Sequence, residues 1–424
     1  MRGKMLIFAG QLRPNRFIQE TLFRQRRPAL LFVVLFVLCC VASDADAQQP
    51  SERDDSRLIL AHYMPWYVAK PVSRVWGWHW TMNTFDPEKR VDGKRAVASH
   101  FYPLIGPYDS GDSNVLEYHL LTMKLAGIDG VIVDWYGLQQ FRDYAILNRN
   151  TQRLIDQASR LGMKVVICYE DQTIPALVMA GRLKSDKRVA QATSEIKWLT
   201  KRWFRLENYV RLKGRPVLLS FGQTGLTNDE WTQCLAGLKS PVAYFSEHLR
   251  RSAAVGAFDW PIPTQGLKAI KRFQKTSLKW PYAIPVAFPR FVDIYAQAKV
   301  SASYGRVADN RGETFKTSMT QALQAKTALL QIATWNDWGE GTMIEPSREF
   351  GYRDLEVLQQ LRRRYLDAQF SATPADLRLP ARLLQRRRMS TTAAQSQRCA
   401  RIATFIATGK LTEARAGLKE NRRR

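Results

Sequence analysis

The chain has 424 residues, 45% of them hydrophobic and 24% charged, a composition that excludes a disordered polypeptide. Its formal net charge of +26 is compatible with anionic partners such as acidic polysaccharides or nucleic acid, although a solvated basic surface explains it more simply. Residues 361–424 hold 16 Lys and Arg against four Asp and Glu, so the net charge says little about the rest of the chain.

The N-terminal segment, residues 1–47, has the pattern of a signal peptide. Basic residues end at Arg27, an apolar run covers 29–41, and Ala45-Asp46-Ala47 supplies a cleavage site of small residues. The apolar run is about a dozen residues long, shorter than the roughly 20 that a membrane-spanning helix requires. We therefore expect cleavage after Ala47 and a secreted or periplasmic protein without a stable membrane span. An uncleaved anchor is the less favoured alternative.

After this segment, short apolar runs rich in β-branched residues alternate with segments of helical periodicity. The alternation indicates parallel strands joined by crossover helices. The eight predicted strands are 58–64, 130–135, 164–169, 216–221, 242–246, 255–260, 284–288 and 329–335. The predicted helices between them are 115–126, 151–161, 190–206, 229–238, 266–276 and 314–326.

Eight strands in about 310 residues predict an α/β fold, a (β/α)₈ TIM barrel, which we place at residues 57–368. A doubly wound open sheet would alternate in the same way, but the Gly-rich turn expected after its first strand is absent. The first βα connection holds a long insertion, 68–114, which we expect to be a structured loop at the catalytic end. Residues 369–424 are expected to form a basic helical tail, with a hairpin over 396–420 that turns at Gly409. A packing role for this tail is favoured over a binding role.

The residues that end each apolar run are the candidates for substrate binding, because the active site of a TIM barrel lies at the carboxyl ends of its strands. These ends are rich in aromatic rings and carboxylates, which suit the C–H faces and the hydroxyl groups of sugars. Any one of them is more often a structural cap or an ion-pair partner, and only their convergence on one rim favours a site. The candidates are Trp66, Tyr67, Asp134, Trp135, Tyr136, Tyr169, Glu170, His248, Trp260, Trp335, Asn336, Trp338 and Glu345.

Asp337 and Glu340 are the candidate catalytic pair. Cleavage of a glycosidic bond needs one carboxylic acid that protonates the leaving oxygen and a second carboxylate that acts as base or nucleophile. Two carboxylates that lie close together push their pKa values apart, which provides an acid and a base at one pH. Gly339 and Gly341 allow the backbone to turn tightly, so both side chains are able to face one site.

Other chemistries have no support in the sequence. There is no Cys and His pattern with zinc-ligand spacing, no phosphate-binding loop and no G-x-S-x-G elbow. Cys168 lies in an apolar run and Cys234 in a helical one, so both are expected to be buried packing residues. Cys399 leaves the number of cysteines after residue 47 odd, which does not fit a disulfide framework. We expect no metal and no cofactor.

The segment that follows the last predicted strand resembles a known motif. It reads Trp335-Asn336-Asp337-Trp338-Gly339-Glu340-Gly341-Thr342-Met343-Ile344-Glu345-Pro346 and is similar to the N-E-W-x-E-G-T-x-I-E-P motif of glycoside hydrolase family 99, the endo-α-1,2-mannosidase family, and its family 71/99-like bacterial relatives. Further similar segments occur in the same order at 63–67, 106–110, 126–136 and 169–171. The resemblance spans roughly residues 58–366.

The resemblance implies a (β/α)₈ retaining glycosidase without a redox cofactor. The second Glu of the family motif, which acts as general acid and then deprotonates the water, corresponds to Glu340. The first Glu of the motif, which deprotonates the sugar's own 2-hydroxyl, corresponds to Asp337. Asp is one methylene shorter than Glu, and this departure bears on both the family mechanism and mannose as the substrate.

The sequence thus predicts an exported glycoside hydrolase that cleaves α-glycosidic bonds in a polysaccharide or glycan, and anionic glycans are among the candidate substrates. The alternative is a carbohydrate-binding protein that kept the barrel and lost turnover through the change at Asp337. A protein that binds nucleic acid is a third interpretation. It is disfavoured because the positive charge is concentrated in the tail and no recognition motif accompanies it.

Overall fold

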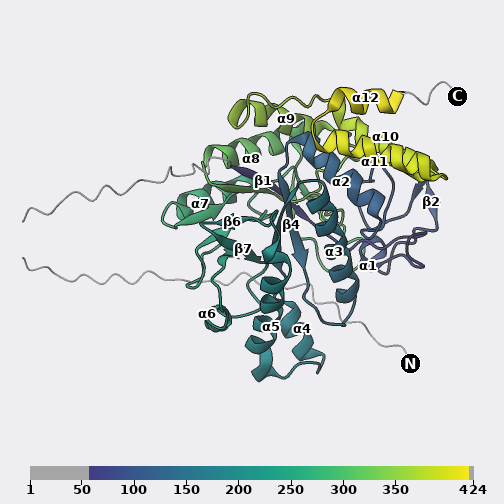
Figure 1. Cartoon of the computed structure of the whole chain (residues 1–424). Helices are drawn as coiled ribbons and strands as arrows, with labels where there is room; N and C mark the ends of the chain where they lie inside the picture. The colour runs from purple at the N-terminus through teal and green to yellow at the C-terminus, as the bar shows by residue number, and fades with distance from the viewer. Residues whose placement is uncertain (1–56, 420–424) are drawn as a thin grey trace, which may run out of the picture. The chain divides into compact units, whose positions relative to one another are not determined.

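A computed structural model describes residues 57–419, which form a barrel of parallel strands surrounded by helices (Figure 1). The predicted signal peptide, residues 1–47, lies outside the described residues, so export remains a prediction. Within residues 57–419, none of the helices combines the length and the apolar character that crossing a bilayer demands.

The strands confirm the predicted barrel. Those of the main sheet are β1 (Leu58–Tyr63), β4 (Gly130–Trp135), β5 (Lys164–Tyr169), β7 (Arg215–Ser220), β8 (Ala243–Glu247), β9 (Gly256–Phe258), β10 (Tyr282–Ile284), β11 (Val286–Ala287) and β14 (Leu329–Ile332), with the short β6 (Arg211–Leu212) antiparallel to β7. The order is β10-β9-β8-β7-β5-β4-β1-β14-β11. Only Pro285 separates β10 from β11, so these two segments act as one strand that returns the sheet to its starting point. Each of the eight predicted strands has its counterpart.

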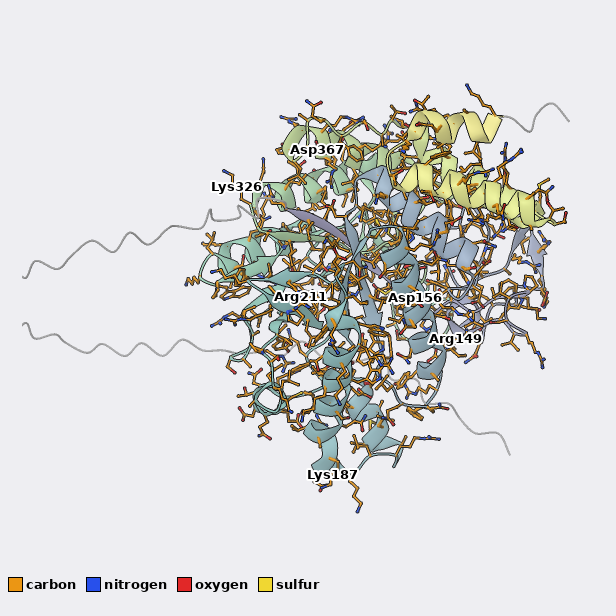
Figure 2. All side chains as sticks on the ribbon, viewed as in Figure 1. Arg149, Asp156, Lys187, Arg211, Lys326 and Asp367 are labelled. Carbon is orange, nitrogen blue, oxygen red and sulfur yellow. The ribbon has the colours of Figure 1, made fainter. Side chains whose placement is uncertain are left out.

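Helices cover the outside of the barrel. They are α2 (Ser113–Ala126), α3 (Tyr144–Arg160), α4 (Thr173–Met179), α5 (Arg188–Lys201), α6 (Asn228–Ala236), α7 (Leu267–Ser277), α8 (Glu313–Gln324) and α9 (Arg353–Tyr365). All six predicted helices are present. Helix α9 is absent from the predicted set, although Leu355, Leu358 and Leu361 give it one buried face. Charged side chains such as Lys187 and Lys326 project from the periphery (Figure 2).

The strands separate two hydrophobic layers, and this separation positions the site. Alternate residues of a strand point to opposite faces. In β1, Leu60 belongs to the cluster inside the barrel, whereas Ile59 and Ala61 belong to the cluster between the barrel and the helices. Any two neighbouring residues at a strand end therefore face different layers.

The insertion that follows β1 is a structured loop, as predicted. It contains α1 (Trp78–Thr81) and the antiparallel pair β2 (Arg90–Val91) and β3 (Lys94–Arg95). The indole Nε1 of Trp80 donates to the carbonyl oxygen of Tyr108 at 2.7 Å, and Trp80 is fully buried. The insertion is thus fixed by its own core.

The C-terminal tail is helical, as predicted. It forms α10 (Leu379–Met389), α11 (Ala393–Ala407) and α12 (Leu411–Lys419), with a turn at Gly409, whose φ is 74°. Helices α10 and α11 pack against α2 (Figure 1), and Arg387 forms an ion pair with the buried Glu117 at 2.9 Å. Helix α10 was not predicted, and the domain boundary at 368/369 remains a prediction.

Candidate active site

The loop after β14 carries the predicted catalytic pair in a tight turn. The backbone N–H of Asp337 donates to Thr334 Oγ1 at 2.8 Å, and the backbone N–H of Glu340 donates to Asp337 Oδ1 at 3.0 Å. These two bonds fold residues 334–340 back on themselves. Asp337 is buried and Glu340 is half-buried, and neither forms an ion pair with any of residues 57–419.

A second segment holds this loop in place. Strand β12 (Phe291–Val292) pairs with β13 (Arg306–Val307), and the N–H groups of Val292 and Ile294 donate to the carbonyl oxygens of Glu340 and Gly339, both at 2.9 Å. Gly341 has a φ of 67°, and a Cβ there would lie 2.8 Å from the Val292 carbonyl oxygen. Glycine is therefore required at this position.

The two carboxyl groups differ in electrostatic environment. Burial raises the pKa of Asp337 to about 6, and hydrogen bonds from the backbone N–H groups of Glu340 and Gly339 oppose a larger rise. Burial raises the pKa of Glu340 well above its usual range, and the negative charges of Asp337 and Asp293 raise it further. The backbone stabilises the carboxylate form of Asp337, so Asp337 ionises first and Glu340 keeps its proton.

Three more carboxyl groups from neighbouring strands face the pair. Asp134 on β4 and Glu247 on β8 are buried, as is Glu170 just after β5. Burial raises the pKa of Asp134 and of Glu170, and the charge of Asp134 raises the pKa of Glu170 further. The charge of Asp337 raises the pKa of Asp134, and that of Glu247 raises the pKa of Glu340. Asp134, Glu170, Glu247, Asp337 and Glu340 therefore form one group, which we call the acidic rim.

Tyrosine and aspartate residues after β11 complete the surroundings of Glu340, and the sequence analysis did not single them out. The hydroxyl of Tyr295 lies 3.5 Å from Glu340 Oε1. Asp293 accepts hydrogen bonds from Ser303 Oγ at 2.9 Å and from the N–H of Tyr304 at 2.8 Å. The available signal was positional, since Asp293 and Tyr295 follow the seventh predicted strand, 284–288, just as Tyr136 follows the second, 130–135. Glu247 directly follows the fifth predicted strand, 242–246, and is not among the predicted candidates.

Aromatic rings gather beside the acidic rim. Trp66 stacks on His79 with ring centroids 4.3 Å apart, and Tyr136 meets Trp66 edge-on at 6.5 Å. Trp66 and Tyr136 are both partly exposed, so their rings remain available for a ligand. Tyr67 is buried, and its hydroxyl accepts a hydrogen bond from the N–H of Trp338 at 2.9 Å, which gives it a role in supporting the loop.

Three of the predicted substrate-binding residues point the other way. Trp135, Tyr169 and Trp335 are fully buried in the layer between the barrel and the helices. Trp135 stacks against Trp198, and the hydroxyl of Tyr169 donates to Glu195. Their burial in this layer contradicts their prediction as sugar-binding residues. At the ends of β4 and β5, Asp134 and Glu170 occupy the inward positions, and neighbouring residues face opposite layers.

Three further candidates lie beneath the catalytic loop and hold it. Asn336 bonds to both backbone groups of Met64, at 2.8 and 3.0 Å. Glu345 accepts hydrogen bonds from Tyr108 at 2.7 Å and from the indole of Trp338 at 3.2 Å, and it also contacts His119 at 3.1 Å. All of these side chains are buried. Asn336, Trp338 and Glu345 are thus supports of the loop rather than contacts for a ligand.

The two remaining candidates lie on the far side of the acidic rim. His248 is partly exposed and lies 3.4 Å from Asp259 and 3.8 Å from Glu247. Trp260 is buried, with its ring edge-on to His62 and to Phe221, both at 4.8 Å. His248 is placed to contact a ligand, whereas Trp260 closes the barrel interior below it.

A cavity of about 680 Å³ lies elsewhere, at the amino ends of the strands. Its walls come from the ends of α7 and α8 and from the starts of β10 and β14, and they include Trp280, Tyr282 and Lys326. None of the candidate site residues lines it. This cavity is therefore separate from the acidic rim.

Comparison with known proteins links this arrangement to one family. Residues 56–243 match the family model of glycosyl hydrolase family 99. The zebrafish (Danio rerio) glycoprotein endo-alpha-1,2-mannosidase-like protein is 24% identical over 288 residues, which is 61% of this chain and 62% of that protein. The mouse (Mus musculus) glycoprotein endo-alpha-1,2-mannosidase is 22% identical over 281 residues, 59% of this chain and 57% of that protein. The chain thus spans less than two thirds of the length of these relatives.

A solved structure has the same fold. The GH99 endo-alpha-mannosidase from Bacteroides thetaiotaomicron superposes with a TM-score of 0.55 at 19% sequence identity, over 74% of this chain and 97% of that chain. At this identity the likeness is one of fold. It extends the similarity well past residue 243, where the family match ends.

Proposed function

Because residues 56–243 match the family model of glycosyl hydrolase family 99, we propose that the chain is a glycoside hydrolase of that family that cleaves α-glycosidic bonds in a glycan, with Glu340 and Asp337 as its acid and base. The observation that carries this proposal is the pair itself. A buried and a half-buried carboxyl group on one turn form no ion pair with Lys or Arg among residues 57–419, and both have pKa values raised by burial. Buried carboxylates without such partners are destabilised as anions, which suits proton transfer and not structural pairing.

The proposed reaction uses the difference between the two groups. Glu340 keeps its proton and donates it to the leaving glycosidic oxygen. Asp337, held as a carboxylate by the backbone N–H groups of its own loop, deprotonates the sugar's 2-hydroxyl, whose oxygen then attacks the anomeric carbon. Glu340, now ionised, deprotonates the water that opens this intermediate, so the anomeric configuration is retained. The shorter side chain at 337 places the reacting sugar closer to the loop backbone than a Glu would.

We propose a neutral glycan as the substrate. Within the part of the chain that the structure describes, no carboxyl group of the acidic rim forms an ion pair with Lys or Arg, and only His248 lies near Glu247, at 3.8 Å. A uronate or sulfate in this place would meet like charges in a region of low dielectric. Much of the positive net charge of the chain lies in the C-terminal tail. It therefore does not argue for an anionic substrate at the acidic rim. The names of the relatives favour mannose in α-1,2 linkage.

The signal-peptide pattern of residues 1–47 supports export, and we propose that the mature enzyme works in the periplasm or outside the cell. Comparing the N-terminal residue of the protein from cell extract, periplasm and medium tests this. A mature N-terminus at Gln48 in an exported fraction supports the proposal, and retention of residues 1–47 in the cell contradicts it.

The decisive experiment is turnover by the Glu340→Gln variant. The wild-type protein is screened on neutral α-linked mannans and oligosaccharides for release of reducing ends, and the anomeric form of the first product is read by proton NMR. Glu340→Gln should lower turnover by about 10²- to 10⁴-fold, while the matched Glu313→Gln variant, exposed at the start of α8, should leave it unchanged. Full activity of Glu340→Gln contradicts the assignment. Binding of glycans by the wild type without any cleavage supports instead a carbohydrate-binding protein that lost turnover through Asp337.

A further inference from the structure

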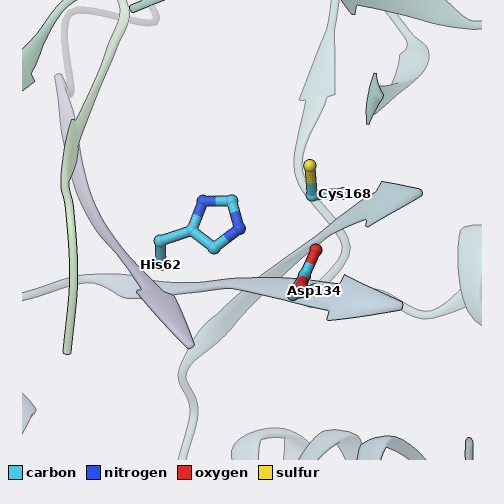
Figure 3. A group of neighbouring side chains, drawn as sticks. All are labelled: His62, Asp134 and Cys168. Carbon is cyan, nitrogen blue, oxygen red and sulfur yellow. The ribbon is translucent and has the colours of Figure 1, made fainter. Parts of the chain in front are cut away.

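A second polar group lies inside the barrel, formed by His62 on β1, Asp134 on β4 and Cys168 on β5 (Figure 3). Each offers one potential ligand atom, and these three atoms lie within 4.8 Å of one another. All three side chains are buried, with exposures of 0%, 2% and 0%. The strands that carry them are adjacent, in the order β5-β4-β1, and Asp134 and Cys168 are direct partners in the sheet register.

The polar atoms of this group are largely unpartnered. Among the described residues, no hydrogen-bond partner is found for either ring nitrogen of His62 or for Oδ1 of Asp134. A buried polar atom without a partner costs roughly 1–3 kcal/mol, and native proteins contain few of them. One ring nitrogen of His62 and one carboxylate oxygen of Asp134 lie within 4.8 Å of each other and of the Cys168 sulfur, and this arrangement indicates a ligand shared between the three side chains.

The side chain of Gln331 lies beside His62. The side-chain amide of Gln331 donates to the Asp259 carbonyl, which leaves its Oε1 free to accept from the imidazole. A histidine ligand usually donates its second N–H to such an oxygen, which fixes the ring.

We propose that His62, Asp134 and Cys168 form a binding site for one divalent cation of the Zn²⁺ class. Imidazole nitrogen, thiolate sulfur and carboxylate oxygen are the donors that zinc takes, three from the protein with a fourth position left open. One thiolate and one carboxylate balance the charge of a divalent ion, which permits its burial among Trp260 and the other interior rings. Hard cations such as Ca²⁺ and Mg²⁺ prefer all-oxygen sites and fit this donor set poorly.

The geometry requires a small contraction. Ligand bonds of about 2.0–2.3 Å in a tetrahedron place the donor atoms roughly 3.3–3.8 Å apart, against the present limit of 4.8 Å. Rotation about the side-chain bonds that moves the donor atoms by about one ångström closes this difference without a change in the strands. Binding displaces the thiol proton of Cys168, which is released to solvent.

The test measures metal content and not turnover, so its failure is distinguishable from a failure of the proposed hydrolase function. The whole protein is stripped with a chelator, dialysed with Zn²⁺ or Co²⁺, desalted and analysed by elemental mass spectrometry. We expect one ion per chain. In the Co²⁺ form we expect the near-ultraviolet charge-transfer band of a cobalt–thiolate bond. Glu340→Gln should give the same result as the wild type.

Two variants assign the ligands. Cys168→Ala should abolish the charge-transfer band and lower metal affinity by on the order of 100-fold or more, and Asp134→Asn should lower the affinity without removing the band. Cys234→Ala, which removes a buried thiol in α6, is the matched control and should keep both. A wild-type protein that retains no stoichiometric metal overturns the proposal, as does a band that survives in Cys168→Ala. The wild-type measurement decides the matter even where a variant fails to fold.

Discussion

Two buried aspartates of this molecule lie in opposite electrostatic surroundings. Asp376, just before α10 in the tail, accepts two hydrogen bonds from Arg415, both at 2.8 Å, and one from the N–H of Thr373 at 2.9 Å. Among residues 57–419, Asp337 in the catalytic loop accepts hydrogen bonds only from backbone N–H groups of its own turn. Burial by itself would raise the pKa of both, but the partners of Asp376 reverse the effect and lower its pKa, whereas that of Asp337 is about 6.

The difference shows that burial alone does not decide what a carboxyl group does. A guanidinium partner turns Asp376 into a fixed anion that ties α12 to the start of α10. Without such a partner, Asp337 is held near the pH at which it exchanges its proton, and the folded state is less stable for it. The same residue type therefore stabilises the tail and destabilises the acidic rim.

The largest expected effect is on turnover. Asp337→Asn should lower kcat/KM by about 10²- to 10⁴-fold, because an amide is unable to accept the proton of the sugar hydroxyl. Asp376→Asn, the matched change in the tail, should leave kcat/KM of the folded fraction unchanged. Steady-state rates on the best substrate of the α-mannan panel measure both. Equal losses in the two variants would remove the distinction between the rim and the tail.

Removal of the Arg415 guanidinium should leave Asp376 buried without a cationic partner, which is the situation of Asp337 in the acidic rim. Arg415→Ala leaves Asp376 buried without its counter-charge and should lower the free energy of unfolding by about 1–3 kcal/mol at pH 7, less than for a fully buried pair because Arg415 is partly exposed. Urea denaturation checks this, with Arg401→Ala, exposed on α11, as the control. The deficit should shrink at low pH, since the native pair loses its contribution as Asp376 protonates. A pH-independent deficit contradicts the electrostatic explanation.

The contribution of Asp337 to the free energy of unfolding should depend on pH in the opposite sense to that of Asp376. The pKa of Asp337 is raised from 3.8 to about 6, so the unfolded chain releases this proton first and the protein loses stability as the pH rises from about 4 to about 6. Asp337→Asn removes this effect and should stabilise the fold by about 1–3 kcal/mol at pH 8, with little change at pH 4. Thermal unfolding at both pH values measures the difference. An Asn variant less stable than the wild type at pH 8 would argue against an unpaired anion.

The smallest effect concerns the tuning of the acid. The Tyr295 hydroxyl lowers the pKa of Glu340, so Tyr295→Phe should raise that pKa and move the alkaline limb of the kcat/KM profile to higher pH. The loss of rate at the optimum should be less than about 10-fold, since the acid itself remains. Tyr282→Phe, at the opposite end of the barrel, serves as the control. An unchanged alkaline limb would show that the Tyr295 hydroxyl does not influence the pKa of Glu340.

The sequence determines most of the barrel, because hydrophobic periodicity is a local property. The strand 130–135 is predicted to the residue, and the turn at Gly409 is marked by a glycine that the left-handed conformation favours. The correction to the predicted sugar-binding residues also follows from the sequence. Asp134 and Trp135 are neighbours on a strand, so only one of them is able to face inward.

The tertiary structure alone decided which polar residues meet. Asn336 and Glu345 are polar residues of the same segment as Asp337 and Glu340, but their hydrogen bonds to Met64 and Tyr108 place them beneath the loop. His62, Asp134 and Cys168 are 34 or more positions apart, and no linear spacing marks them as a set. They come together because the register of three parallel strands brings inward-facing positions to one height in the barrel, a property of the closed sheet and of no single segment.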